Sequence, residues 1–170
     1  MIAISRKSCF HVENSPVILM STLAQFTNLP LLVPRLAGDH RESIVAELGQ
    51  RLASTGRIDN AAAFGRAVLE HEELAPAVFD GVAFPLAHKG VLQELSFAIG
   101  FAPEPIHWGA SHGPLVHTVV LFAVPLADEK RYLSLVLAFS KFLADGTNFK
   151  VLRACIRPDE MLEVLGRIRF

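Results

Sequence analysis

The sequence predicts an α/β fold: a three-layer sandwich in which helices cover both faces of a central mixed sheet. Three observations lead to this expectation. Amphipathic helix patterns lie at both ends of the chain, strand patterns lie between them, and residues 116–124 form a near-continuous apolar run. Such a run is typical of a strand that is buried on both faces. Strands that are flanked in the sequence by helices favour one sheet with a helical layer on each side.

The composition is that of a folded domain without an unusual charge. The chain has 170 residues, of which 51% are hydrophobic and 19% are charged, and its formal net charge is −1. This suits one domain with a substantial core, and it gives no indication of nucleic-acid binding. No apolar run reaches the roughly 20 residues that span a bilayer. Cys9 and Cys155 lie far apart, as in proteins of a reducing cytoplasm.

These bulk properties define several expectations. Residues 1–20 are expected to form an N-terminal extension, and residues 21–170 one domain. We expect a cytoplasmic protein that inserts into no membrane and binds no nucleic acid. The sequence contains no Walker A, G-x-S-x-G or G-x-G-x-x-G motif and no zinc-binding cysteine pattern, so no cofactor and no metal are expected.

The first third of the chain predicts two amphipathic helices. Asp39 stands at an N-cap position with Glu42 as its capping-box partner. Apolar residues then recur at helical spacing over 44–52, and a second helix ends near residue 73. Three charged residues of the first helix are expected to form a solvated face: Arg41, Glu47 and Arg51.

Two more strands and three helices complete the pattern. A strand over 95–101 is expected to end at Pro103 and Pro105, because proline lacks the N–H of a ladder hydrogen bond. A long helix follows the central strand, and shorter ones are expected over 149–155 and from Pro158 onwards. The predicted buried side of the long helix consists of Leu133, Val136, Leu137, Ser140 and Leu143, and Phe139 and Phe142 are expected to widen it.

The stretch 80–90 combines a short strand with a polar turn. An apolar run ends at Pro85, and His88 and Lys89 lie in the turn. A neutral imidazole is a nucleophile near pH 7. Phosphoryl transfer to it needs an exposed ring nitrogen and a cation, which Lys89 or Arg131 could supply. On chemistry alone, a His–Lys pair in a loop is more often ordinary surface.

Three histidines give a weaker alternative, a small-ligand or metal-binding domain. His107, His112 and His117 recur every five residues across a loop and a strand. Helical metal sites use i, i+4 pairs, and no Asp, Glu or Cys lies between these histidines. The simpler interpretation is two loop histidines and one hydrogen-bonded histidine near a strand end.

Several segments occur in the order found in one known family. They are Gly81-Val82-Ala83-Phe84-Pro85, Pro105-Ile106-His107-Trp108-Gly109, the strand 119–125 and the helix 133–145. From about Leu23 to Ile168 the sequence resembles the enzyme IIA component of the bacterial phosphoenolpyruvate-dependent phosphotransferase system, of the fructose–mannitol and nitrogen-regulatory type. The resemblance implies a cytoplasmic domain whose histidine accepts a phosphoryl group from the phosphocarrier protein HPr or a related carrier. The group then passes to a sugar-specific IIB domain for transport, or its presence regulates partner proteins.

Two positions depart from the pattern of this family. A gapless match puts Leu86 in the place of the phosphorylated histidine, directly after the proline, and leucine cannot bind phosphate covalently. The second site histidine matches Tyr132. We therefore favour a regulatory IIA-like domain that is not phosphorylated. The alternative is a two-residue insertion after the proline that makes His88 the phosphoryl carrier, with Lys89 or Arg131 neutralising the phosphate. Catalytic activity and homo-oligomerisation stay open.

Overall fold

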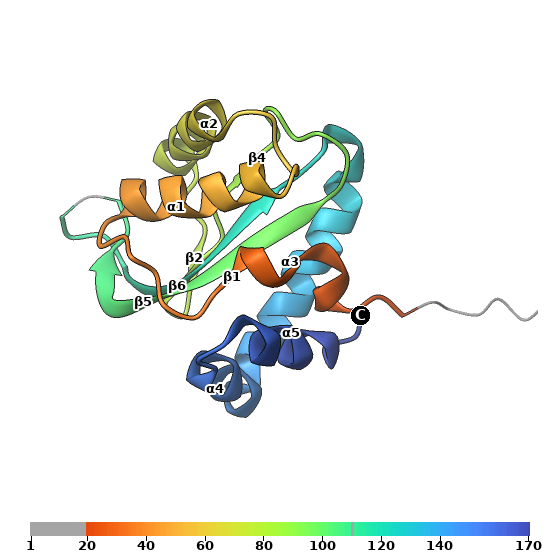
Figure 1. The fold of residues 1–170 in the computed structure, drawn as a ribbon. Coiled ribbons are helices and arrows are strands. Elements are labelled where there is room, and N and C mark those ends of the chain that lie inside the picture. The colour runs from red at the N-terminus through yellow and green to blue at the C-terminus, as the bar shows by residue number, and fades with distance from the viewer. Residues whose placement is uncertain (1–19, 110) are drawn as a thin grey trace, which may run out of the picture.

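The computed structural model describes residues 20–109 and 111–170, so the N-terminal extension expected over 1–20 lies, except for Met20, outside the described residues. The described chain forms three layers (Figure 1). The helices α1 (Arg41–Ser54) and α2 (Ala61–Leu74) cover one face of a six-stranded sheet. The other face is covered by α3 (Glu129–Ala144), α4 (Gly146–Ala154) and α5 (Pro158–Gly166). The predicted α/β sandwich is confirmed.

The sheet is mixed. Its strands are β1 (Leu32–Val33), β2 (Val78–Phe79), β3 (Val82–Ala83), β4 (Leu86–Ala87), β5 (Ser96–His107) and β6 (Leu115–Ala123). They are arranged in the order β1-β5-β6-β3-β2, and β4 also pairs with β6. The β5–β6 and β2–β3 pairs are antiparallel, whereas β1–β5, β3–β6 and β4–β6 are parallel. Three short 3-10 helices lie outside the sheet: η1 (Leu23–Phe26), η2 (Leu29–Leu31) and η3 (Leu126–Asp128).

Strand β6 separates two hydrophobic cores. Its side chains alternate, so that Val120 and Phe122 face the α3 layer whereas Val119 and Leu121 face α1 and α2. All four are fully buried. The predicted central strand is confirmed, and the reason is the one expected: a strand covered on both faces needs apolar residues at consecutive positions.

An aromatic cluster anchors α3 to the sheet. The ring of Phe139 lies edge-on to three rings of the sheet, with centroid distances of 6.2 Å to Phe84, 5.1 Å to Phe97 and 6.0 Å to Phe122. Edge-to-face pairs of this kind contribute about 0.5–1.5 kcal/mol each beyond the area that they bury. The cluster therefore fixes both the position and the rotation of α3.

The rotation of α3 differs from the prediction. Leu133 and Leu137 are 56% and 62% exposed, so their assignment to the buried side is wrong. Val136 and Ser140 are half-buried. The buried residues of α3 are Leu135, Ala138, Phe139, Phe142 and Leu143, so the predicted burial of Phe139, Phe142 and Leu143 is confirmed. The two phenylalanines remove more apolar area from water than the leucines would, and the helix turns to bury them.

The cap of α1 also differs from the prediction. The N-cap residue is His40 rather than Asp39, and its capping-box partner is Ser43 rather than Glu42. Asp39 instead accepts a hydrogen bond from His40 Nδ1 at 2.6 Å. The helix start was therefore placed one residue too early, within the usual uncertainty of helix boundaries.

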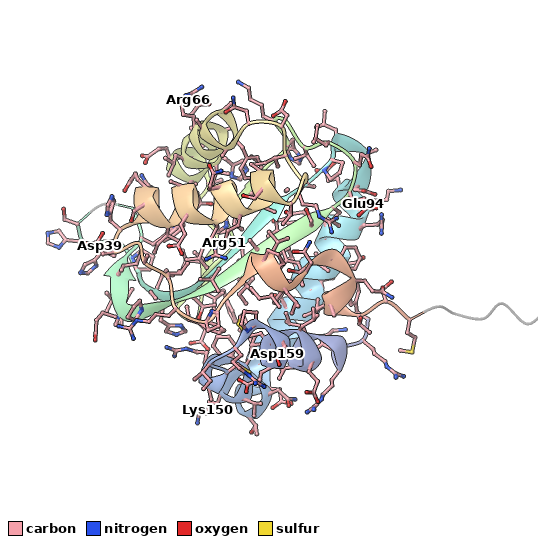
Figure 2. The ribbon with its side chains drawn as sticks, in the orientation of Figure 1. Asp39, Arg51, Arg66, Glu94, Lys150 and Asp159 are labelled. Atoms are coloured by element: carbon pink, nitrogen blue, oxygen red, sulfur yellow. The ribbon has the colours of Figure 1, made fainter. Side chains whose placement is uncertain are left out.

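The charged residues of α1 are not a simple solvated face. The Arg41 side chain is 12% exposed, and its Nη2 lies 2.5 Å from Glu73 Oε1 on α2. Glu47 Oε2 accepts hydrogen bonds from the backbone N–H groups of Ala37 and Gly38. Other charged side chains, such as Arg66 and Lys150, do project from the outer faces of their helices (Figure 2).

Strand β5 does not end at Pro103 as predicted, but continues to His107. Its register against β6 shifts between Phe101 and Ile106. Pro103 and Pro105 both lie in this irregular segment, where no regular ladder needs their missing N–H groups. The two prolines therefore mark an irregularity in the strand rather than its end.

None of the helices in the described part of the chain combines the length and the apolar character that a bilayer crossing requires.

We predict that Phe139→Ala lowers the free energy of unfolding by about 3–5 kcal/mol, because it empties the centre of the aromatic cluster. Chemical denaturation followed by circular dichroism measures this loss. Leu133→Ala on the same helix is the matched control, and it should cost less than about 0.5 kcal/mol because Leu133 is exposed. Equal losses for the two variants would contradict the arrangement of α3.

Candidate functional site

The stretch from Val82 to Ala87 lies beside β6 in one unbroken parallel register. Val82 pairs with Thr118 and Leu86 pairs with Phe122, with the same sequence separation in both pairs. The Phe122 N–H donates to the Pro85 carbonyl at 2.9 Å. Pro85 has no N–H of its own, so it divides the stretch into β3 and β4 without shifting the register. β3 ends before Pro85 as predicted, whereas Leu86 and Ala87 form the further strand β4 rather than a turn.

Leu86 is a core residue of the α3 layer. It is 8% exposed and lies opposite Phe122 on β6. The ring of Tyr132 packs edge-on against the same Phe122 ring, with 5.2 Å between the centroids. The two positions singled out in the sequence, Leu86 and Tyr132, thus adjoin one aromatic residue on one face of the sheet. Together with Phe122 they form an apolar cluster, which we call the Leu86 cluster.

Tyr132 supplies no charge and no nucleophile to this cluster. The residue is half-buried at the start of α3, and burial raises the pKa of its hydroxyl to about 12. The phenol therefore stays neutral across the physiological pH range. Its role in the structure is to cover Phe122.

His88 directly follows β4 in the sequence, and its side chain is exposed. Its Nδ1 is 2.8 Å from the carbonyl oxygen of Val124, the residue after β6. A carbonyl oxygen only accepts hydrogen bonds, so Nδ1 holds the proton and donates it. In the neutral ring, Nε2 then has the free lone pair. The imidazole is consequently held at one nitrogen and available as a base or nucleophile at the other.

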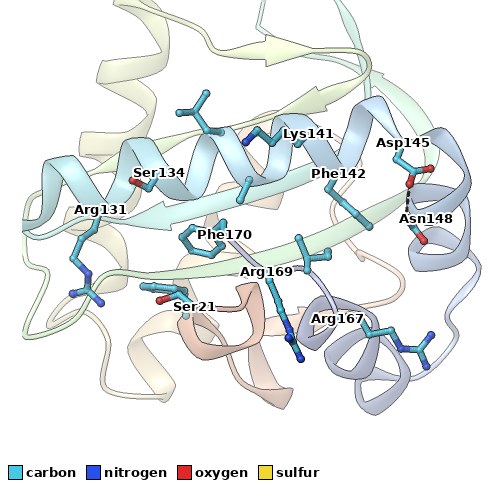
Figure 3. A pocket seen from close by; sticks show the side chains of 14 residues that line it. Ser21, Arg131, Ser134, Lys141, Phe142, Asp145, Asn148, Arg167, Arg169 and Phe170 are labelled. Atoms are coloured by element: carbon cyan, nitrogen blue, oxygen red, sulfur yellow. Dashed lines mark hydrogen bonds between the residues drawn. The ribbon is translucent and has the colours of Figure 1, made fainter. Parts of the chain in front are cut away.

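The two predicted phosphate-binding cations are placed differently. Lys89 is exposed and follows His88 directly. Arg131 forms an ion pair with Asp128, with Nη1 and Oδ1 3.2 Å apart. Its guanidinium also lies over the ring of Phe26, 5.4 Å from the centroid. These contacts bring Arg131 to a pocket between α3 and the C-terminal residues (Figure 3).

The three histidines of the metal-site alternative have separate environments. His107 Nδ1 donates to the Gly113 carbonyl at 2.9 Å, and His117 Nδ1 lies 2.9 Å from the Thr118 hydroxyl. Burial lowers the pKa of His117. Within the described residues, no group of three or more His, Cys, Asp or Glu side chains is arranged to hold a metal ion. These histidines therefore do not assemble a metal site within the described residues.

A buried acid escaped the sequence analysis. Glu72 on α2 is 2% exposed, and its Oε2 accepts a hydrogen bond from Trp108 Nε1 at 2.6 Å. Burial raises the pKa of this carboxyl group. The signal was present in the sequence, because Phe64, Val68 and Glu72 follow each other at spacings of four on one helix face. An acid on an apolar stripe needs a buried partner, and here the partner fastens the end of β5 to α2.

The comparisons with known proteins agree with this architecture. The family model "Phosphoenolpyruvate-dependent sugar phosphotransferase system, EIIA 2" matches residues 30–167. This match covers most of the sequence, and the chain belongs to that family.

Solved structures of the same kind are similar to the described fold. The nitrogen regulatory protein IIA-Ntr from Neisseria meningitidis is 19% identical with a TM-score of 0.73, and the match covers 84% of this chain and 98% of that one. IIA mannitol from Escherichia coli is 19% identical with a TM-score of 0.67, and the match covers 81% of this chain and 97% of that one. A complex of enzyme IIA mannitol with phosphorylated enzyme IIB mannitol from Escherichia coli is 20% identical with a TM-score of 0.68. That match covers 82% of this chain and 97% of the other. At these identities the likeness shows a common fold.

We predict that Tyr132, the one tyrosine of the sequence, shows no phenolate step near pH 10 in the folded protein. Folding raises its pKa from 10.0 to about 12, so the folded state retains the proton where the unfolded state loses it. The contribution to stability is complete below pH 10 and is lost as the pH rises towards 12.

Ultraviolet absorbance of the phenolate measures this titration, while the fluorescence of Trp108 reports whether the fold persists. The same titration in guanidinium chloride is the control, and its midpoint should lie near 10. A native midpoint equal to the denatured one would refute the burial of Tyr132 against Phe122.

Proposed function

We propose that the chain is a regulatory IIA domain that binds a protein partner and is not phosphorylated, with residues 21–170 acting as one domain. The unbroken register from Val82 to Ala87 supports this proposal most strongly. A two-residue insertion after Pro85 could be absorbed locally as a bulge, which would displace the pairing with β6. The pairs before and after Pro85 have the same sequence separation. The gapless match, with Leu86 in place of the histidine, therefore fits this register best.

The chemistry of the Leu86 cluster supports the same proposal. Leucine has no lone pair for a phosphoryl group, and the phenol of Tyr132 is neutral and half-buried. A phosphoryl group placed among Leu86, Phe122 and Tyr132 would be a charge in an apolar environment, which is strongly unfavourable without paired partners. The cluster stabilises the fold at the position where the family holds its phosphate.

The proposed partner is another protein of the phosphotransferase system: an HPr-like phosphocarrier, a IIB domain or a regulatory target. The complex of the Escherichia coli IIA mannitol enzyme with its phosphorylated IIB enzyme gives an example of such a partnership. Of residues 85–90, Pro85, Leu86 and Ala87 are buried, whereas His88 and Lys89 are exposed. These two exposed residues adjoin the start of η3, because His88 bonds to Val124. Leu126 of η3 is 80% exposed and offers apolar contact area there. Such a role places the protein in the cytoplasm.

A second candidate function is a phosphoryl carrier that uses His88, and one observation favours it. The hydrogen bond from Nδ1 to the Val124 carbonyl leaves the Nε2 lone pair free on an exposed ring. Attack by Nε2 would form a new P–N bond as the bond between phosphorus and the donor's histidine breaks. The Nδ1 proton would stay on the imidazole, donated to the Val124 carbonyl, and Lys89 would offset the charge of the phosphate.

Incubation with phosphoenolpyruvate, enzyme I and HPr tests the two candidates directly. We predict that intact-protein mass spectrometry finds no gain of a phosphoryl group on this chain, because neither Leu86 nor Tyr132 can accept one. A phosphorylatable IIA domain in the same mixture is the positive control.

The variants Leu86→His and His88→Ala make this test decisive. A phosphoryl group that appears on wild type and disappears in His88→Ala would overturn the proposal in favour of the carrier. Restored phosphoryl transfer in Leu86→His, with none in wild type, would agree with the gapless match.

We further predict that Leu126→Glu and Lys89→Glu each weaken binding to the partner by about tenfold, because each alters the surface beside His88. Isothermal titration calorimetry with a purified HPr-like carrier and a purified IIB domain measures this. Leu74→Glu is the matched control, since Leu74 is an exposed leucine at the end of α2 on the opposite layer. Equal effects of the three variants would refute this docking surface.

A further inference from the structure

A pocket lies between α3, η1 and the C-terminal residues (Figure 3). Its volume is about 690 Å³, which is in the usual range for small-molecule sites. The wall opposite α3 is held by backbone hydrogen bonds, from Leu23 N–H to the Ile168 carbonyl at 3.2 Å and from Phe170 N–H to the Ser21 carbonyl at 3.0 Å. It is separate from the Leu86 cluster, and the following inference does not rest on the proposed function.

The pocket concentrates positive charge. Its lining includes four cations and a single acid, Asp145, although the whole chain has a net charge of −1. The cations are Arg131, Lys141, Arg167 and Arg169. The carboxylate of Asp145 already accepts hydrogen bonds from Thr147 N–H at 3.3 Å and from Asn148 Nδ2 at 2.6 Å. Asp145 is therefore held at the start of α4, and its single negative charge can offset only one of the four cations.

The four cations differ in their existing partners. Arg131 is paired with Asp128, and Arg167 with Glu163. Within residues 20–109 and 111–170, Lys141 and Arg169 form no ion pair. Both are exposed. These two residues are thus the ones free to bind an anion.

The remaining lining of the pocket is largely apolar. The half-buried Phe170 and Ile168 and the exposed Leu137 supply the accessible apolar area, and the largely buried rings of Phe26 and Phe142 lie behind them. The rings of Phe26 and Phe170 are 5.9 Å apart. Leu137 is one of the leucines of α3 that the fold leaves exposed. An inorganic ion would use the cations but none of this apolar area. A neutral apolar molecule would leave the charges unused.

We propose that this pocket binds a small organic anion with an apolar body, whose charged groups face Lys141 and Arg169 and whose body lies against Phe170. Charge-assisted hydrogen bonds to the two cations select the anion, and burial of the apolar body adds affinity. Since α3 also contains Tyr132, the ligand would contact the helix that covers the Leu86 cluster. Ligand binding would then act on the same helical layer on which the resemblance to the family places phosphorylation.

Titration of the full chain with 8-anilinonaphthalene-1-sulfonate tests this inference, because that probe combines an aromatic body with one sulfonate. The expected result is one saturable site. The double variant Lys141→Glu/Arg169→Glu should bind the probe at least about tenfold more weakly. Arg35→Glu/Arg66→Glu, which reverses two exposed cations outside the lining, is the matched control and should bind like wild type.

Two further probes separate the contribution of the anionic group from that of the aromatic rings. N-phenyl-1-naphthylamine has the same aromatic rings without the sulfonate, and inorganic phosphate is an anion without an apolar part. Both should bind at least about tenfold more weakly than the sulfonate. Equal binding of the neutral analogue, full displacement by a similar concentration of phosphate, or equal affinity of the two double variants would overturn the inference.

Circular dichroism checks that the variants are folded, and Lys141→Gln/Arg169→Gln replaces the charge-reversed pair if that pair does not fold. The glutamine pair should also bind the sulfonate more weakly than wild type. Unchanged binding by the folded glutamine pair would contradict the role of these cations.

Discussion

The double-sided burial of β6 is the constraint on which the rest of the structure depends. The strand is hydrogen-bonded to β5 at one edge and to β3 and β4 at the other, while its faces contribute to two separate cores. A slip of one residue would exchange the side chains of the two cores, so the register is strongly fixed. Leu86 lies opposite Phe122 and His88 beside Val124 for this reason. The positions of Leu86 and His88 are therefore set by the packing of β6 in the hydrophobic cores.

The overall fold could be predicted because its signals are local. The apolar run around Val120 and the helical spacing from Ile44 to Leu52 each report burial directly. The predictions that were wrong, the end of β5 and part of the buried side of α3, depend on contacts with other elements. The shift in register between Phe101 and Ile106 lets β5 include two prolines, and the packing of α3 on the sheet leaves Leu133 and Leu137 exposed. Neither effect can be read from the residues of the segment alone.

The sequence pattern singles out positions that are neighbours in the structure, but it does not define their chemistry. The order of motifs along the chain singled out Leu86 and Tyr132, and the structure places both against Phe122. The carbonyl of Val124 determines which nitrogen of His88 carries the proton. The contacts with Phe26 and Asp128 determine where the Arg131 side chain points. Val124 and Phe26 come from elements that meet these residues only after folding, whereas Asp128 is a local partner, three residues before Arg131. The sequence pattern thus selects neighbouring positions, whereas the protonation of His88 and the charge pairing of Arg131 need the three-dimensional arrangement.

The bridge between Thr22 and Arg169 has a consequence for how this domain can be joined to other proteins. It places the beginning and the end of the described chain side by side, next to η1 (Figure 1). Domains with adjacent ends tolerate circular permutation and insertion into a host loop, because a short linker can close the gap. A fused neighbour at either end would emerge from the same edge of the sandwich. Evolution or an engineer could therefore graft this fold into a larger chain without disturbing the strands at its centre.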